Sequence, residues 1–160
     1  MLQSNLDQII SNKKLKIGIY NISLPEHIDK PQIVLQKENS PDLKVAEFNR
    51  WGADLSIMIK NTIINNLSAA LPNASIVPLS YGANSEYIVK INIEKLTGWL
   101  NNKAILKANW QILNTTSKTI IAETSTFENS AGKNYSSYVI AQSNLLSELS
   151  LNIANKLKNL

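Results

Sequence analysis

The first segment whose residue types could do chemistry surrounds the single histidine of the chain. His27 lies between Glu26 and Asp29, and a neighbouring carboxylate could orient its imidazole as a general base. No serine in a Gly-x-Ser-x-Gly turn accompanies it, and the sequence contains no cysteine, so a nucleophile is missing. We therefore expect His27 to be a surface-loop residue without a catalytic role.

Other chemical sites lack the residues they need. One histidine and no cysteine leave no ligand set for zinc, and no glycine-rich phosphate loop of the dinucleotide or P-loop kind occurs. The carboxylates Glu94, Glu123 and Glu128 fall on separate predicted strands without a pairing pattern, so we interpret them as solvent-facing. The sequence predicts no catalytic residue, no metal and no cofactor, which places the protein outside the enzyme classes.

Arg50 is the only arginine of the chain, and Trp51 follows it directly. A guanidinium binds a carboxylate with two hydrogen bonds or stacks on an aromatic ring, which lysine does poorly. Two interpretations stay open. Arg50 either pairs with Glu47 or Asp54 to fix the start of a helix, or it contacts a partner or ligand.

Length and composition predict a single domain. The 160 residues are 44% hydrophobic and 18% charged, so residues 1–160 can bury a core without disulfides or metal. No run approaches the roughly 18–20 apolar residues that a membrane span needs. The formal charge is +4, but only Lys13, Lys14 and Lys16 form a dense group. Scattered lysines do not indicate a nucleic-acid partner.

Hydrophobic alternation predicts the strands. Residues 15–22 alternate with one apolar face, and residues 33–37 and 43–47 flank a turn-rich cluster that is typical of a hairpin. Residues 75–79 form a further short strand. Three longer strands joined by short turns predict an antiparallel meander. Their shared apolar faces are, in order, Tyr87, Val89, Ile91 and Ile93; then Ala104, Leu106, Ala108, Trp110 and Ile112; then Ile120, Ala122 and Thr124.

Two amphipathic helices complete the prediction. The first begins at Asp54 and ends before Pro72, and the second begins after Gly132. Each has one apolar stripe wide enough to cover a sheet. We therefore predict an α+β fold, in which a mixed, mostly antiparallel β-sheet has two α-helices packed on one face.

An apolar segment stiffened by proline lies outside the regular strands, at residues 24–34. Proline lowers the entropy lost when a loop is fixed against a partner, and Trp and Arg are frequent interface anchors. One interpretation is that this segment docks a protein partner together with the Arg50 region. The other is that it folds back to cap the sheet, held by Arg50. The predicted partner-binding residues are Leu24, Pro25, Ile28, Pro31, Gln32, Arg50 and Trp51.

Four segments resemble the PqiC-type (YmbA-type) ABC-transport auxiliary lipoproteins. Residues 17–34 (IGIYNISLPEHIDKPQIV) are similar to the opening signature of that family, and residues 46–51 (AEFNRW) to its Glu-Phe-x-Arg-Trp block. Residues 66–72 (NLSAALP) resemble the end of its first helix, and the segment that begins at residue 141 (AQS) resembles its closing helix. The matches follow the family order over nearly the whole chain.

The resemblance implies a non-enzymatic lipoprotein on the periplasmic side of the outer membrane of Gram-negative bacteria. It implies an MCE-domain (PqiB-type) partner that forms a lipid-conducting tunnel, and an inner-membrane permease component reached through that partner. Lipid transport and envelope integrity are the implied process. Family members begin with a signal peptide and a lipobox cysteine, so we expect a lipid anchor upstream. We interpret residues from about 1 to 14 as a flexible remnant of the segment after it.

Three other functions have less support in the sequence. A lipid-binding carrier would need an apolar cavity of several hundred Å³ between sheet and helices, and a single stripe on each helix does not favour one. A domain that regulates a cell-wall synthase is suggested only by similar topology. A hydrolase lacks its nucleophile, base and oxyanion donors. Association with further copies of the chain is left open.

Overall fold

The computed structural model describes residues 14–81 and 84–160. Within them the chain forms seven strands and two α-helices, with a short 3-10 turn at Leu79–Tyr81. The predicted N-terminal remnant, except for Lys14, lies outside the described residues. The elements are β1 (Lys16–Ile19), β2 (Gln32–Gln36), β3 (Leu43–Arg50), α1 (Leu55–Ala70), β4 (Ser75–Pro78), β5 (Tyr87–Gly98), β6 (Lys103–Asn114), β7 (Thr119–Ser130) and α2 (Tyr135–Lys158).

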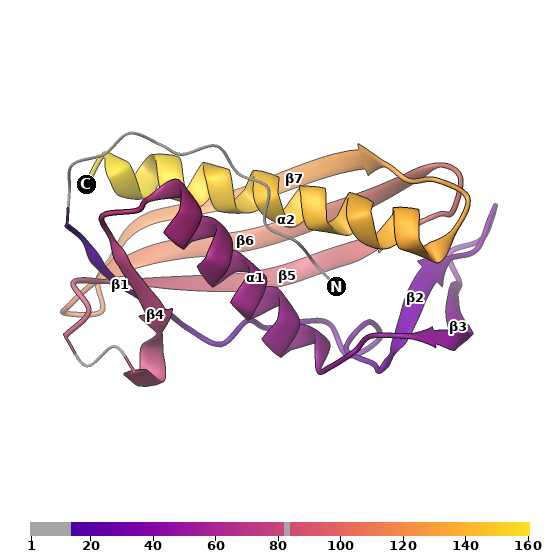
Figure 1. Cartoon of the computed structure of the whole chain (residues 1–160), viewed down its shortest axis with the longest axis horizontal. Helices are drawn as coiled ribbons and strands as arrows, with labels where there is room; N and C mark the ends of the chain where they lie inside the picture. Colours follow the sequence, from indigo (N-terminus) through magenta and orange to yellow (C-terminus); the bar gives the residue numbers. More distant parts are fainter. Residues whose placement is uncertain (1–13, 82–83) are drawn as a thin grey trace.

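Five of the strands form one mixed sheet in the order β4-β1-β5-β6-β7. The pairs β5/β6 and β6/β7 are antiparallel, whereas β1 is parallel to both of its neighbours. This arrangement confirms the predicted α+β class and the meander. The predicted hairpin also forms, but as a separate two-stranded sheet of β2 and β3 at the end of the molecule where α2 begins (Figure 1).

Helix α1 begins where the sequence predicts, because Asp54 caps it. One carboxylate oxygen of Asp54 accepts hydrogen bonds from the backbone N–H groups of Ser56, at 3.0 Å, and Ile57, at 3.3 Å. These bonds satisfy donors that have no partner inside the helix. The hydrogen bond from the Ser56 hydroxyl, followed by those from the backbone, lowers the pKa of Asp54.

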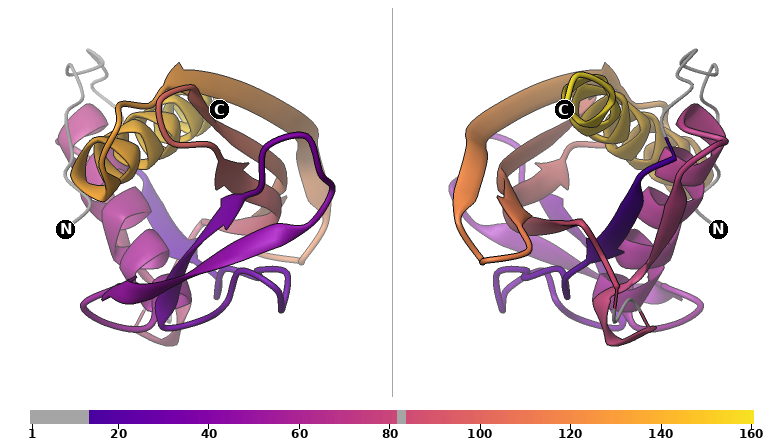
Figure 2. Two further views of the ribbon diagram at one scale, coloured as in Figure 1. Left: turned by 90° about the vertical axis from the view of Figure 1, so that its right-hand side faces the viewer. Right: turned by 90° about the vertical axis from the view of Figure 1, so that its left-hand side faces the viewer.

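Both helices cover the same face of the curved sheet, as the two end views show (Figure 2). Along β6, every second side chain is buried under this layer, and those between are half-buried on the other face. The two small alanines among them let α2 approach the strand closely. The residues of β6 on the helix side are Ala104, Leu106, Ala108, Trp110 and Ile112, which confirms the predicted register.

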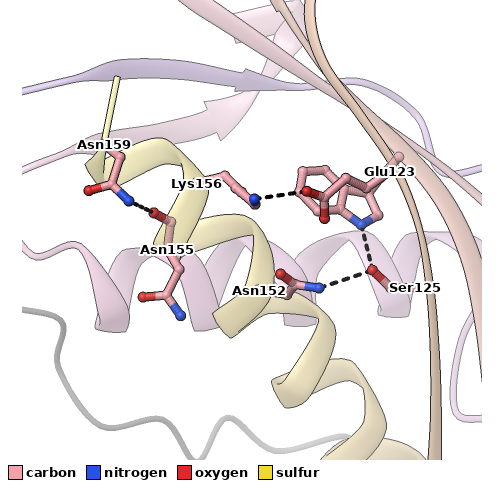
Figure 3. Close-up of polar contacts among 7 residues, drawn as sticks. Glu123, Ser125, Asn152, Asn155, Lys156 and Asn159 are labelled. Atoms are coloured by element: carbon pink, nitrogen blue, oxygen red, sulfur yellow. Dashed lines mark hydrogen bonds and ion pairs between the residues drawn. The ribbon is translucent and has the colours of Figure 1, made fainter.

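Polar contacts fix α2 on the last two strands (Figure 3). The hydroxyl of Ser125 accepts hydrogen bonds from Trp110 Nε1, at 2.9 Å, and from Asn152 Nδ2, at 3.0 Å. One turn further along α2, Lys156 Nζ lies 2.9 Å from a carboxylate oxygen of Glu123. The first of these bonds satisfies the indole N–H, which would be costly to bury alone.

The predicted facing of β7 is wrong. Ile120, Ala122 and Thr124 are exposed on the face away from the helices, whereas Ser125 is buried and Phe127 half-buried on the helix side. The reason is an irregularity in the pairing with β6. Ile112 pairs with Ile121, but its neighbour Leu113 pairs with Thr119, so one residue of β7 is skipped. A shift of one residue exchanges the two faces of a strand.

The same shift corrects the interpretation of Glu123. It was predicted to face solvent, but its side chain lies on the helix side and pairs with Lys156. Glu128 and Glu94 do lie on the uncovered face, where each forms an ion pair with a lysine of β6, Lys103 and Lys107 respectively.

We predict that Trp110→Ala lowers the free energy of unfolding by roughly 3–5 kcal/mol, because a 2% exposed indole is removed and Ser125 loses a donor. Denaturant unfolding measures the change. The matched control is Ile120→Ala on the opposite face of the sheet, which should cost less than about 1 kcal/mol. Equal costs for the two variants would contradict the observed facing.

Candidate functional site

The residues just before the predicted docking segment run beside β5. The backbone N–H of Tyr20 donates to the carbonyl of Val89, and that of Ile93 donates to the carbonyl of Ser23, at 3.0 and 2.9 Å. A turn follows, in which the Pro25 carbonyl accepts from the N–H of Ile28 at 3.1 Å. Main-chain hydrogen bonds therefore hold the approach to the segment, and its first residues form a hydrogen-bonded turn.

The first three predicted docking residues lie against the core. Ile28 is only 2% exposed, and Leu24 is partly buried against the same cluster. Pro25 is half-buried. This part of the segment folds back onto the sheet, as the alternative interpretation expected. Ile28 consequently positions the loop from inside, and a partner could touch it only if the loop moved.

The remaining four predicted residues come together where β2 and β3 meet. Gln32 pairs with Arg50 across the hairpin, and the backbone N–H of Trp51 donates to the carbonyl of Pro31 at 2.8 Å. Two segments that are some twenty residues apart thus form one continuous surface. Proline and the main-chain hydrogen bond hold its shape.

A large bulge in β3 shapes this surface. Val34 pairs with Val45 and Gln32 pairs with Arg50, so four residues of β3 lie opposite the single residue Ile33 of β2. Phe48 lies within the bulge and is 86% exposed. Sequence reasoning did not select Phe48 as a docking residue, although the AEFNRW block contains it. We call the group of Pro31, Gln32, Phe48, Arg50 and Trp51 the hairpin surface.

Arg50 does not have the structural role that one interpretation gave it. Its side chain is exposed and makes no ion pair with any residue of the described ranges. Asp54, one of the two expected partners, uses its carboxylate to cap α1 instead. The guanidinium of Arg50 is therefore free to bind a carboxylate or stack on an aromatic ring of a second molecule.

Two aromatic side chains attach the hairpin to the rest of the molecule. The hydroxyl of Tyr138, on α2, donates to the carbonyl of Val34 at 3.4 Å, and Trp99 Nε1 donates to the carbonyl of Lys37 at 3.4 Å. Tyr138 is fully buried, and this burial raises its pKa above the ordinary value for tyrosine. These two hydrogen bonds thus hold the hairpin, and with it the hairpin surface, against the rest of the domain.

The surroundings of His27 do not complete a catalytic group. His27 is exposed and lines a cavity of about 340 Å³ together with Glu94 and Thr97. Glu94 is held by Lys107, at 2.7 Å, and by Asn109, and these hydrogen bonds lower its pKa. An ionised carboxylate bound in this way is a poor proton donor. Among the described residues, no three His, Asp or Glu side chains gather where they could hold a metal ion.

The family of the chain follows from its sequence. A family model described as "ABC-type transport auxiliary lipoprotein component" matches residues 3–154, so the chain belongs to this family. The resemblance found in the sequence is thereby confirmed. No curated protein matches the chain. Neither helix of the described part combines the length and the apolar character that crossing a membrane requires.

Solved structures with low sequence identity share the fold. The crystal structure of an uncharacterized protein has a TM-score of 0.80 and 17% identity, over 96% of this chain and 99% of that one. A Xanthomonas campestris protein has a TM-score of 0.77 and 12% identity, over 96% and 89%. The PelC dodecamer of Paraburkholderia phytofirmans has a TM-score of 0.54 and 11% identity, over 91% and 88%.

We predict that Tyr138→Phe lowers the free energy of unfolding by about 1 kcal/mol near neutral pH, because the Val34 carbonyl loses its donor. The wild type should also lose stability at high pH. Its folded-state Tyr138 pKa is raised, so the contribution of this group is complete below about pH 10 and is lost as the pH rises further.

Urea unfolding of both proteins across this pH range tests the second part. The difference in stability between wild type and Tyr138→Phe should shrink above about pH 10, since phenylalanine does not ionise. Parallel loss of stability in the two proteins would contradict the role of this buried hydroxyl.

Proposed function

We propose that the protein is a non-enzymatic lipoprotein component of an MCE-type (Pqi-like) ABC lipid-transport system. In this proposal the domain stands on the periplasmic side of the outer membrane and docks with the MCE tunnel protein through the hairpin surface. The inner-membrane permease component is reached through that protein. The observation that carries the proposal is an exposed Phe48 and Arg50 beside a half-buried Trp51, on a bulged, firmly supported hairpin.

The composition of the hairpin surface suits protein docking. Aromatic residues and arginine are enriched at the centres of interfaces, where they bury large areas with few rotatable bonds. Phe48 projects into solvent, and the Arg50 guanidinium has no partner within the described residues. A fully exposed phenylalanine gains the free energy of burial only when a second molecule covers it.

Rigidity of the support favours the same function. The core behind the hairpin contains Val34 and Ile33, both nearly inaccessible, and Tyr138 joins it to α2. A surface that is ordered before binding loses less conformational entropy when the partner docks. This arrangement supports a role in partner docking for Pro31, Gln32, Arg50 and Trp51. It gives less support to such a role for Leu24, Pro25 and Ile28, which lie deeper.

The carrier alternative has weaker support. The side chains between sheet and helices, such as Leu106, Ile63 and Leu146, have no exposed area, so this layer is filled. The largest cavity described in the chain lies on the uncovered face of the sheet, outside the layer between sheet and helices. The alternative of a cell-wall synthase regulator has only likeness of fold to support it.

We predict that Phe48→Ala and Trp51→Ala each weaken binding to the MCE-domain protein at least about tenfold, because each removes an aromatic contact. Arg50→Lys should also weaken binding, since lysine keeps the charge but not the planar hydrogen-bonding group. Purified domain and MCE protein, measured by light scattering or biolayer interferometry, provide the test.

The matched control is Tyr81→Ala. Tyr81 is 82% exposed, nearly as much as Phe48, but lies beside β4, away from the hairpin. Circular dichroism and thermal unfolding establish that each variant is folded. Folded hairpin variants that bind as tightly as wild type and Tyr81→Ala would refute the docking surface. Wild-type domain that shows no binding to the MCE protein would refute the proposed partner.

A further inference from the structure

The face of the sheet that the helices leave uncovered carries a cavity of about 570 Å³. Its floor consists of residues of the three long strands, most of which face away from the helices. One wall comes from the segment after β1, which is held beside β5 by a hydrogen bond of 2.7 Å from the Ser23 hydroxyl to Asn92. The cavity shares no residue with the hairpin surface. Its principal polar residues are Tyr20, Asn21, Lys90, Asn92, Asn109 and Gln111.

The amide oxygens of this cavity already have hydrogen-bond donors. Asn92 Oδ1 accepts from Ser23, and Asn21 Oδ1 accepts from Lys60 Nζ at 3.1 Å. Gln111 Oε1 accepts from the Thr119 hydroxyl at 2.9 Å. The oxygen of the fourth amide, on Asn109, accepts from Thr124 at 2.6 Å.

The side-chain nitrogens of these amides remain available to donate hydrogen bonds to a ligand. A carboxamide has one oxygen that accepts and one NH₂ group that donates two hydrogen bonds. Asn109 Nδ2 donates to Glu94, but within residues 14–81 and 84–160 no acceptor is assigned to the side-chain nitrogens of Asn21, Asn92 or Gln111. Because their oxygens are fixed, these amides keep their orientation before any ligand arrives.

The charge of the cavity is positive. Lys90 Nζ lies 4.9 Å from the centre of the Tyr20 ring and has no carboxylate partner in the described part of the chain. Glu123 also lines the cavity, but its carboxylate is paired with Lys156 at 2.9 Å. Glu94, which accepts from Asn109 of the cavity, is neutralised by Lys107. An ammonium group and several N–H donors thus face a space without a free carboxylate.

We propose that this cavity binds a phosphate-type oxyanion, as inorganic phosphate, a soluble phosphate ester or the phosphate of a lipid headgroup. Phosphate oxygens accept hydrogen bonds and carry negative charge, which matches the donors and the ammonium of Lys90. A neutral sugar could bond to these amides and hydroxyls too, but it would gain nothing from the charge of the Lys90 ammonium. An apolar chain would leave the amide N–H groups without water or partner, which is costly.

Three probes establish the class of ligand and its source. The labelled domain is titrated with inorganic phosphate, with glycerol 3-phosphate and with methyl glucoside, and the side-chain NH₂ resonances are followed by NMR. Saturable shifts of the Asn92 and Gln111 resonances with the two phosphates, and none with the sugar, are expected. Vesicles of phosphatidylglycerol and of phosphatidylcholine, in a flotation assay, distinguish a headgroup from a free solute.

Two variants test the residues. Asn92→Asp keeps the oxygen that accepts from Ser23 but replaces the NH₂ donor with a second, negatively charged oxygen. Lys90→Met removes the cation and keeps most of the side-chain length. Each should weaken phosphate binding about tenfold or more, since charged hydrogen bonds are lost. The matched controls are Asn61→Asp and Lys44→Met, which make the same changes at exposed positions on α1 and β3.

Either source of the phosphate supports the proposal, provided that Asn92→Asp and Lys90→Met weaken binding and the controls do not. Three results would overturn it. These are the absence of saturable binding of any phosphate probe, tighter binding of methyl glucoside than of phosphate, and unchanged phosphate affinity in both folded variants. The binding of the MCE protein is measured separately, so either proposal can fail alone.

Discussion

Packing of α2 against β6 is the interaction on which the other features depend. Ala104 and Ala108 let the helix lie close to the strand, and the hydroxyl of Ser125 satisfies the one polar group that Trp110 brings into this layer. Since both helices occupy this face, the opposite face of the sheet is left to polar side chains. The start of α2 also supports the hairpin through Tyr138. The position of the helices on one face of the sheet therefore explains both sites. It supports the hairpin surface and leaves the opposite face free for the amide-lined cavity.

Most of the fold could be predicted because its local patterns are unambiguous. The middle parts of β5 and β6 alternate between apolar and polar residues, and Asp54 gives α1 a clear beginning. β7 could not be assigned in this way. Its isoleucine and alanine at 120 and 122 suggest one face, yet the pairing with β6 skips a residue and buries Ser125 instead. Such a skip depends on the partner strand and leaves no sign in the local sequence.

The candidate sites could also be predicted where they depend on residue type and local sequence. They could not be predicted where they depend on contacts between distant segments. Pro31, Gln32, Arg50 and Trp51 could be selected by residue type, and the predicted hairpin explains why they meet. The exposure of Phe48 depends on the size of the bulge, which alternation does not encode. The cavity was missed entirely. Its polar residues come from four segments, and the bond between Ser23 and Asn92 joins positions 69 residues apart.

The bulge in β3 has a consequence for how chains behave when they are crowded. β3 pairs only with β2 among the described strands, so its other edge presents unpaired backbone groups. A flat edge of this kind would invite the strand of a neighbouring copy to continue the ladder, which leads to aggregation. Three extra residues and the charged side chains of Lys44 and Glu47 interrupt that row of groups. The irregularity that exposes Phe48 thereby also protects the protein from polymerising through this edge.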